Sequence, residues 1–195
     1  MKKIVLVLTL VLAATAAAQQ QPAPAKAPVP KPLTGSIASR PDWPKANPKD
    51  VGSIDAIVAA LYDVISGSKG QARDWNRFRS LFIPDARLIP LRLDKDTHSA
   101  DAVILSIADY IARSSPFLET EGFFEHGKID HYVEIGRSAA VWSSYESRNA
   151  KDDPKPFASG VNTIQLIWDN NRYWIVQVLW ETEIPGSPIE VKHLK

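Results

Sequence analysis

The spacing of apolar residues changes once along the chain, close to residue 122. In the first half, large apolar side chains recur every three or four positions, which is the period of an amphipathic helix. The clearest case follows Ser53, a good N-cap residue, and ends before Gly67. The spacing predicts helices over 54–65, 75–82 and 101–113, and a turn with a short strand over 85–93 that Pro90 interrupts.

After residue 122 apolar side chains alternate with polar ones, which is the period of a half-buried strand. Turn residues separate the strands: Gly136 with Arg137, a polar loop over 149–156 and an Asn-rich turn over 169–172. The expected strands are 122–135, 139–148, 159–168 and 173–183. Helices followed by an antiparallel meander predict an α+β domain, in which helices cover one face of a curved sheet.

The first 18 residues have the three parts of a secretory signal peptide. Lys2 and Lys3 form a basic start, residues 4–14 are apolar, and small residues lead to Ala18. The apolar run is shorter than the roughly 20 residues that a membrane-spanning helix needs. Because the chain has no Cys, a lipid anchor at the cleavage site is excluded. We expect cleavage of residues 1–18, no membrane span afterwards, and a periplasmic or secreted mature protein.

Residues 19–50 hold eight of the fifteen prolines and almost no large apolar residues. Such a segment buries too little apolar surface to offset the entropy of ordering, and its prolines favour extended conformations. We interpret it as a Pro-rich disordered spacer, with Trp43 as a candidate to pack back onto the domain. The remaining residues, 51–195, are expected to form one domain.

Charge and composition exclude several functions. Removal of residues 1–18 takes two lysines from 23 basic side chains, so 21 remain against 22 acidic ones. A net charge near −1 offers no positive surface for nucleic acid. The His residues lack the paired spacing of metal ligands, and the chain has no phosphate loop, nucleophile elbow or dinucleotide motif. We therefore expect neither a metal nor a cofactor.

Three features occur together in this chain: the helical segment 57–62, the segment 75–86 with its Phe-x-Pro-Asp-Ala end, and the four long closing strands. With these features the chain resembles the nuclear transport factor 2-like (NTF2-like) superfamily, including its SnoaL-like branch. Segments 141–148, 160–166 and 173–183 are similar to those of secreted bacterial members. The likeness covers about residues 50–190, which is nearly the whole predicted domain.

The resemblance implies a cone-shaped curved antiparallel sheet, covered by three N-terminal helices, that encloses a pocket. The superfamily includes ketosteroid isomerases, polyketide cyclases and dehydratases, and also members that only bind or associate. Alignment with the isomerases puts Pro90 where their general base stands and Ile57 where their oxyanion-hole tyrosine stands. Proline cannot accept a proton, so the likeness does not extend to that mechanism.

The strand over 123–135 has two faces of different polarity. Odd positions such as Phe123 and Ile129 are mostly apolar, whereas even positions such as His126 are mostly polar. We expect the odd face to point inward, which places His131 on an apolar wall where burial can tune its pKa. His131 is therefore the candidate catalytic base or ligand contact, with a hydrogen-bonded core histidine as the alternative.

Four further residues are candidate ligand contacts, because each carries a polar group or a large ring on an otherwise apolar face. Tyr62 lies on the apolar stripe of the first predicted helix, while Tyr145, Asn162 and Trp180 lie on predicted strands. For each of them, simple packing in the core is the alternative interpretation.

Three functional hypotheses follow. The first is an exported, cofactor-independent domain that binds a small, mainly apolar molecule in its cone. The second is an acid–base enzyme of the lyase or isomerase type, with His131 as base and Tyr145 or Asn162 polarising the substrate. The third is a structural module whose cone is filled by side chains. We also expect a homodimer through the convex sheet face, which is expected to carry Tyr132, Tyr173, Ile175 and Leu179.

Overall fold

The computed structural model describes residues 31–94, 96–97, 99–169, 171–184 and 188–189. Every element below belongs to the unit formed by residues 32–195. The expected signal peptide, and the expected spacer up to residue 30, lie outside the described residues. Within the described part of the chain, no helix has the length and apolar character needed to span a bilayer.

Helices come before and between the first strands, and the long strands follow. The helices are a 3₁₀ turn η1 (Ile37–Ser39), α1 (Pro48–Val51), α2 (Ile54–Ile65), α3 (Trp75–Leu81) and α4 (Ile107–Thr120). The strands are β1 (Phe82–Leu93), β2 (Ala100–Ala102), β3 (Leu105–Ser106), β4 (Phe124–Ile135), β5 (Ser138–Arg148), β6 (Ala158–Trp168) and β7 (Tyr173–Thr182).

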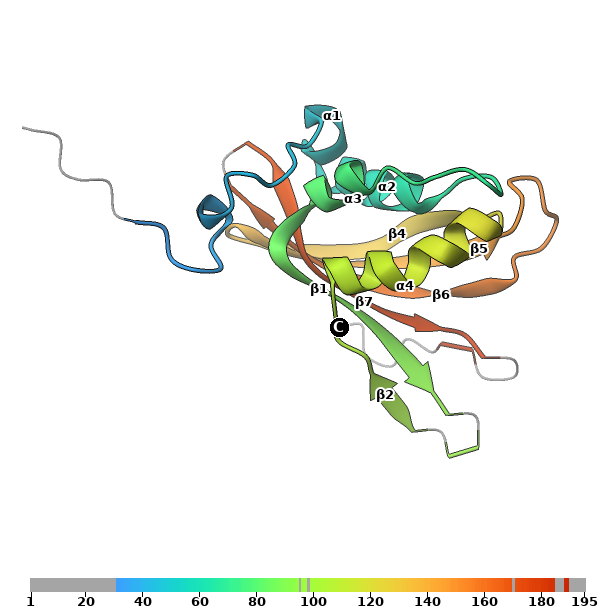
Figure 1. Ribbon diagram of the computed structural model, residues 1–195. Helices are drawn as coiled ribbons and strands as arrows, with labels where there is room; N and C mark the ends of the chain where they lie inside the picture. Colours follow the sequence, from blue (N-terminus) through green and yellow to red (C-terminus); the bar gives the residue numbers. More distant parts are fainter. Residues whose placement is uncertain (1–30, 95, 98, 170, 185–187, 190–195) are drawn as a thin grey trace, which may run out of the picture. The chain divides into compact units, whose positions relative to one another are not determined.

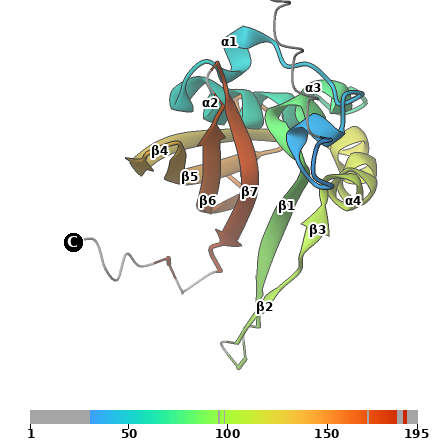
Figure 2. The same ribbon diagram turned by 90° about the vertical axis from the view of Figure 1, so that its left-hand side faces the viewer.

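The strands form one curved, open sheet with the order β2-β1-β7-β6-β5-β4, and β3 pairs with β1 beside this path. Neighbouring strands are antiparallel except for β1 and β7, which are parallel. Figures 1 and 2 show α2, α3 and α4 on the same face of the sheet, called the inner face from here on. The predicted α+β class, a curved antiparallel sheet covered by helices, is confirmed.

The core lies between α2 and the inner face. The helix begins where the Ser53 hydroxyl accepts the N–H of Ala56 at 3.1 Å, which satisfies a donor that the first turn leaves unpaired. Burial of each large apolar side chain contributes about 1.5–3 kcal/mol, so this helix–sheet contact is a main source of stability. Its most buried members are Ile57, Phe78, Leu81, Phe82, Val141, Ile164, Leu166 and Ile175.

Helix α4 begins and ends later than the predicted helix over 101–113. Its start is a capping box: the Ser106 hydroxyl accepts the N–H of Asp109, and the Asp109 carboxylate accepts the N–H of Ser106. Residues before Ser106 instead form β2 and β3, which pair with β1. The helical prediction for 101–106 is wrong because strand pairing, a long-range contact, outweighs the local spacing.

Strand β1 is continuous, and the prediction that Pro90 interrupts it is wrong. Proline removes one N–H donor but leaves its carbonyl, which accepts the N–H of Val103 at 3.1 Å. The flanking residues stay paired on both sides, with Leu88 opposite Val178 and Leu91 opposite Ala102. One missing donor therefore does not break the strand.

Part of the expected spacer packs on the domain. The indole N–H of Trp43 donates to the carbonyl oxygens of Arg79 at 3.1 Å and Phe82 at 2.9 Å. Asp50 accepts a hydrogen bond from Arg77 at 2.8 Å, and Val51 is buried. Trp43 thus packs back as expected, and the packed domain starts before residue 51.

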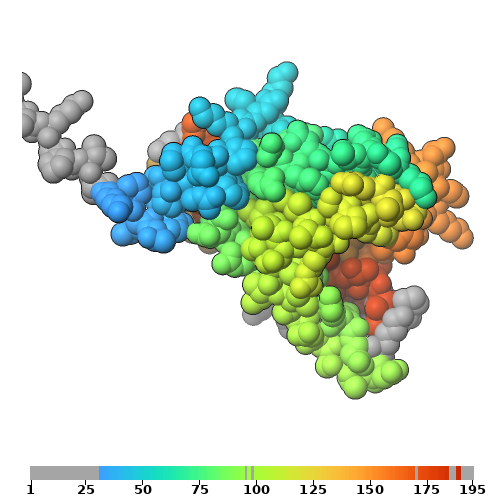
Figure 3. Space-filling model, viewed as in Figure 1, coloured from blue at the N-terminus to red at the C-terminus, as the bar shows by residue number. Residues whose placement is uncertain are grey.

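The end of β1 and all of β2 extend beyond the helix and sheet layers as an arm (Figures 1 and 2). Every residue of β2 is exposed, so this strand adds nothing to the core. In the space-filling view, residues of β7 (red) remain visible between α4 (yellow) and this arm (Figure 3).

Candidate functional site

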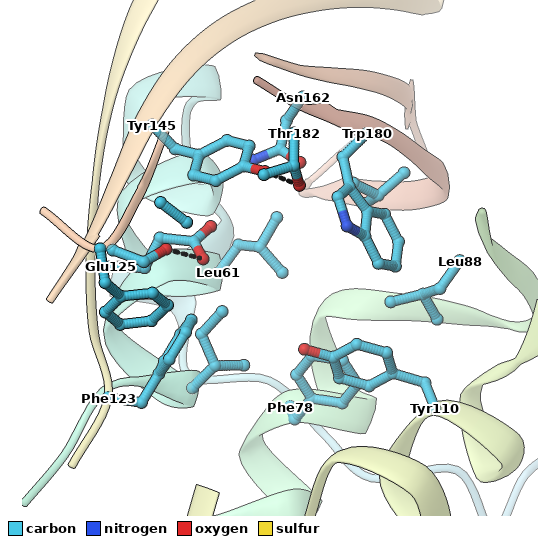
Figure 4. A pocket seen from close by; sticks show the side chains of 15 residues that line it. Leu61, Phe78, Leu88, Tyr110, Phe123, Glu125, Tyr145, Asn162, Trp180 and Thr182 are labelled. Atoms are coloured by element: carbon cyan, nitrogen blue, oxygen red, sulfur yellow. Dashed lines mark hydrogen bonds between the residues drawn. The ribbon is translucent and has the colours of Figure 1, made fainter. Parts of the chain in front are cut away.

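A cavity of about 220 Å³ lies between the inner face and helices α2, α3 and α4 (Figure 4). It exceeds the roughly 150 Å³ of an engineered apolar cavity that binds benzene, and is smaller than a typical drug-sized site of about 300 Å³ or more. A molecule of about one ring fits this space. The lining is Leu61, Ile65, Phe78, Leu88, Phe123, Phe157, Ala158, Val178 and Trp180, together with the polar Tyr110, Glu125, Tyr145, Ser147, Asn162 and Thr182.

Glu125 is the one charged side chain among the described lining residues. Its carboxylate accepts a hydrogen bond from the Ser147 hydroxyl at 3.2 Å (Figure 4). Burial raises the pKa of the Glu125 carboxyl to about 7, and hydrogen bonding with Ser147 and Asn162 opposes part of this increase. A carboxyl with this pKa changes its charge close to neutral pH, a property that is enriched at functional sites.

A chain of hydrogen bonds behind the cavity joins α2 to three strands. The Asn162 amide donates to the Tyr62 hydroxyl at 3.0 Å, and that hydroxyl donates to Ser143 Oγ at 2.8 Å. Ser143 in turn donates to the Lys128 carbonyl at 3.0 Å. Burial raises the pKa of Tyr62 to about 12, so its hydroxyl stays protonated near neutral pH. The chain therefore holds the Asn162 side chain in one orientation beside the cavity.

Two glycines make room for the tyrosine rings. A Cβ on Gly127 would lie 2.0 Å from the Tyr62 ring. A Cβ on Gly160 would lie 2.6 Å from the Tyr145 hydroxyl and 2.1 Å from the Glu181 carbonyl. These separations are far inside van der Waals contact, so both positions require glycine for this arrangement of rings.

Aromatic side chains form much of the wall. The Tyr110 ring stacks on Phe78 with centroids 5.3 Å apart and meets Trp180 edge-on at 6.3 Å. The Tyr145 hydroxyl lies 2.8 Å from Oγ1 of Thr182 (Figure 4). Burial raises the pKa of Tyr145 to about 12 and also raises the pKa of Tyr110. Both phenols are therefore neutral near pH 7.

Three of the five candidate residues, Tyr145, Asn162 and Trp180, lie together at the cavity. Tyr62 stands behind them and reaches the cavity through its bond to Asn162. His131 is not among them: it is exposed, and its ring lies against Trp142 with centroids 5.8 Å apart. The expectation that His131 faces the pocket is wrong, and contact of the other four with a ligand stays a prediction.

A β-bulge explains the outward position of His131. The residue before Asp130 is in register with Ser143, and His131 is in register with the adjacent Trp142, so Asp130 is an extra residue in β4. The Asp130 carboxylate accepts the backbone N–H of Ser144 at 2.7 Å, which gives that donor a partner at the interrupted ladder. Beyond the bulge the two faces of β4 exchange, so odd positions point outward.

Glu125 was missed by the interpretation of the sequence. The polar residues of this strand were expected on its even face, but Glu125 occupies an odd position, between Phe123 and Ile129. A carboxylate on an otherwise apolar face was the available signal in the sequence.

No group of three or more Asp, Glu or His side chains suited to a metal ion occurs among the described residues. The titratable acid of the cavity lining is the Glu125 carboxyl, which can contact a cation or exchange a proton.

We predict that Glu125→Gln stabilises the protein increasingly as pH rises. The pKa of the folded-state carboxyl, about 7, lies above its usual value of 4.5. Stability due to the protonated carboxyl is therefore complete below about pH 4.5 and is lost as pH rises through about 7. The neutral amide avoids this loss. The difference in the free energy of unfolding should be near zero at about pH 4 and about 1–3 kcal/mol at about pH 8.

Chemical denaturation of both proteins across this pH range measures the effect. The exposed Glu121, changed to Gln, serves as the matched control and should show no such growth with pH. A stability difference for Glu125→Gln that stays constant with pH would contradict the prediction.

A scan against protein-family models finds no match, and no curated protein sequence matches the chain. Solved structures do match. A protein of unknown function with a cystatin-like fold, from Nostoc punctiforme PCC 73102, is 13% identical with a TM-score of 0.51, covering 69% of this chain and 91% of that chain. A ketosteroid isomerase-like protein from Erwinia carotovora atroseptica SCRI1043 is 17% identical with a TM-score of 0.49, covering 70% and 98%.

A NTF-2 like protein of unknown function from Silicibacter pomeroyi DSS-3 is 13% identical, with a TM-score of 0.47 and coverage of 67% of this chain and 92% of that chain. Identities this low establish likeness of fold alone. The match to the Nostoc protein, together with the curved sheet and the covering helices, shows that this domain is similar in fold to a protein with a cystatin-like fold.

Proposed function

We propose that the domain binds a small, mainly apolar molecule in its cavity without a cofactor. The observation that carries the proposal is an open space of about 220 Å³ lined by aromatic and aliphatic side chains, on which a few polar groups converge. These are the common features of a small-molecule site. Tyr145 and Asn162 supply neutral polar contacts, Trp180 forms a wall, and Tyr62 orients Asn162.

The open cavity weighs against a purely structural cone that is filled by side chains. The Trp174 ring packs under the Arg172 guanidinium, 3.5 Å from its centroid, and its N–H donates to Asp169 at 2.7 Å. Trp168 packs on Tyr173, with ring centroids 4.8 Å apart. Neither tryptophan is part of the cavity lining, so the space is not closed by them.

The acid–base alternative draws on Glu125 instead of His131. A carboxyl with a pKa of about 7 suits a general acid or base. Such a reaction also needs a group that polarises the substrate. Tyr145 and Asn162 are candidates for this role, although their hydrogen bonds to Thr182 and Tyr62 use part of their capacity. Binding requires no such alignment of a base with a polarising group, so binding is the function that we propose.

The proposal predicts that the protein binds toluene, a neutral one-ring probe, and that Ala158→Leu weakens this binding several-fold. Ala158 lines the cavity, so the larger side chain fills space that the probe would occupy. Saturation-transfer NMR with a toluene titration measures both affinities.

Ala140→Leu is the control, because it adds the same group on the opposite face of the neighbouring strand β5. It should leave toluene binding unchanged. Equal weakening by both variants, or no binding to the wild-type protein, would count against the cavity as a ligand site.

We propose as well that two copies associate through the outer face of the sheet. Large apolar side chains are exposed there: Val133 at 40%, Ile135 at 73% and Trp142 at 38%. The bulge turns Val133 and Ile135 to this face, beside β5. A solvated sheet face needs no such cluster, whereas an association surface does.

The residues expected to form this surface differ in part from those found there. Ile175 is fully buried in the core. Tyr132 is in register with the buried Val141 and so lies on the inner face. Tyr173 lies on the same face as Ile175, two positions away, and its hydroxyl donates to Glu134. The choice of these three residues was wrong, because the bulges in β4 and between β6 and β7 shift the alternation of faces.

If the outer face pairs, sedimentation at micromolar concentration should give twice the monomer mass, and Trp142→Glu should give the monomer. A buried, unpaired charge at the centre of an apolar interface opposes association strongly. Ile104, which is 66% exposed away from this face, provides the control Ile104→Glu, which should stay dimeric. A wild-type monomer would refute the dimer.

We propose that the chain is exported, on the basis of the signal-peptide features in residues 1–18. The mature protein would then work in the periplasm or outside the cell. N-terminal sequencing of the exported protein should begin at or near Gln19. Recovery of intact chains that still begin at Met1 would argue against cleavage.

A further inference from the structure

The cavity encloses a carboxylate that has no cationic neighbour among the described lining residues. The influences on the pKa of Glu125 are burial and hydrogen bonding with Ser147 and Asn162, and none of them comes from a positive charge. An ionised carboxylate can accept about four hydrogen bonds. Glu125 therefore keeps acceptor capacity and an unneutralised charge on the side that faces the cavity.

Aromatic rings surround the space that this carboxylate faces. Figure 4 shows Phe123, Tyr110, Trp180 and Tyr145 around the open centre, with the Glu125 side chain directed toward it. The faces of aromatic rings carry partial negative charge and attract cations within about 6 Å of their centroids. The rings and the carboxylate thus favour the same kind of ligand group.

Other ligand chemistries fit less well. A carboxylate or phosphate on the ligand would meet the negative Glu125 and find no cation among the described lining residues. A fully neutral apolar ligand would displace water from Glu125 and leave an ionised carboxylate poorly solvated, which is unfavourable. A cationic group avoids both costs.

We propose that the cavity binds a protonated organic amine of about one ring in size, with its ammonium group on Glu125 and its apolar part between Phe78, Tyr110 and Trp180. This inference rests on the proposed function, since it names the ligand class for the same cavity. Nitrogen-bound protons of the ammonium would donate to the acceptor sites that Ser147 and Asn162 leave on the carboxylate, and the ring walls would exclude water.

The proposal implies a pH dependence with a definite sign. The titratable groups that face Glu125 are Tyr62 from α2, Tyr110 from α4 and Tyr145 from β5. The pKa of each is raised, so all three are neutral between about pH 5 and 8. Glu125 is then the group that titrates, and amine affinity rises with pH as it ionises around 7.

The test compares benzylamine with benzyl alcohol, two probes of nearly equal size of which only the amine is charged at about pH 8. Calorimetric titration of the wild-type protein should show at least about tenfold tighter binding of the amine. That preference should shrink at about pH 5.5 and disappear in Glu125→Gln, which keeps the shape and loses the charge. Glu121→Gln, on the surface, should keep the wild-type preference.

The possible outcomes separate the two proposals. Equal affinity for both probes in the wild-type protein overturns the amine inference while leaving the cavity as a ligand site. An amine preference that survives in Glu125→Gln also overturns it, because the ammonium is then recognised elsewhere. Binding of neither probe, with toluene also excluded, overturns the proposed function together with the inference.

Discussion

The close approach of the Tyr62 ring to the backbone of Gly127 is the contact on which the site depends. It is possible because residue 127 has no side chain: a Cβ there would lie 2.0 Å from the ring. In this position the Tyr62 hydroxyl donates a hydrogen bond to Ser143 and accepts one from the Asn162 amide. One phenol therefore connects α2 to both β5 and β6. The helix is thereby held at a fixed height over the sheet, and the cavity occupies the space left beside it.

The ionised Glu125 carboxylate lowers the stability of the folded protein. A carboxyl whose pKa rises to about 7 on burial is a group that the unfolded chain would ionise more readily, so its charge is a cost to the native state. Structural ion pairs do not account for it, since hydrogen bonding with Ser147 and Asn162 is the compensation found. Groups whose pKa is strongly shifted by burial, and which have no stabilising ion pair, are concentrated at functional sites. The same carboxyl gives an otherwise apolar cavity its chemical character.

One extra residue in β4, Asp130, determines which side chains lie on the outer face of the sheet and which lie on the inner face. Because Asp130 is accommodated as a bulge, the apolar Val133 and Ile135 turn outward to join Trp142, and His131 leaves the inner wall with them. The inner face gains Tyr132 and Glu134 in exchange, and Glu134 accepts a hydrogen bond from Tyr173 at 2.6 Å. The cavity wall and the proposed association surface are thus separated along a single strand.

The sequence by itself determined the elements whose signal is local. The Ser53 cap with its apolar stripe specified α2, and alternation with turn residues specified β4 to β7, which together imply the α+β class and place Tyr145, Asn162 and Trp180 on one wall. Tertiary structure decided the rest. The strand character of residues 101–102 and 105–106 comes from pairing with β1, and the side to which His131 points comes from pairing with β5. The pKa of Glu125 depends likewise on enclosure by residues distant in the chain. These are long-range contacts, whose energies exceed local preferences and leave no periodic trace in the sequence.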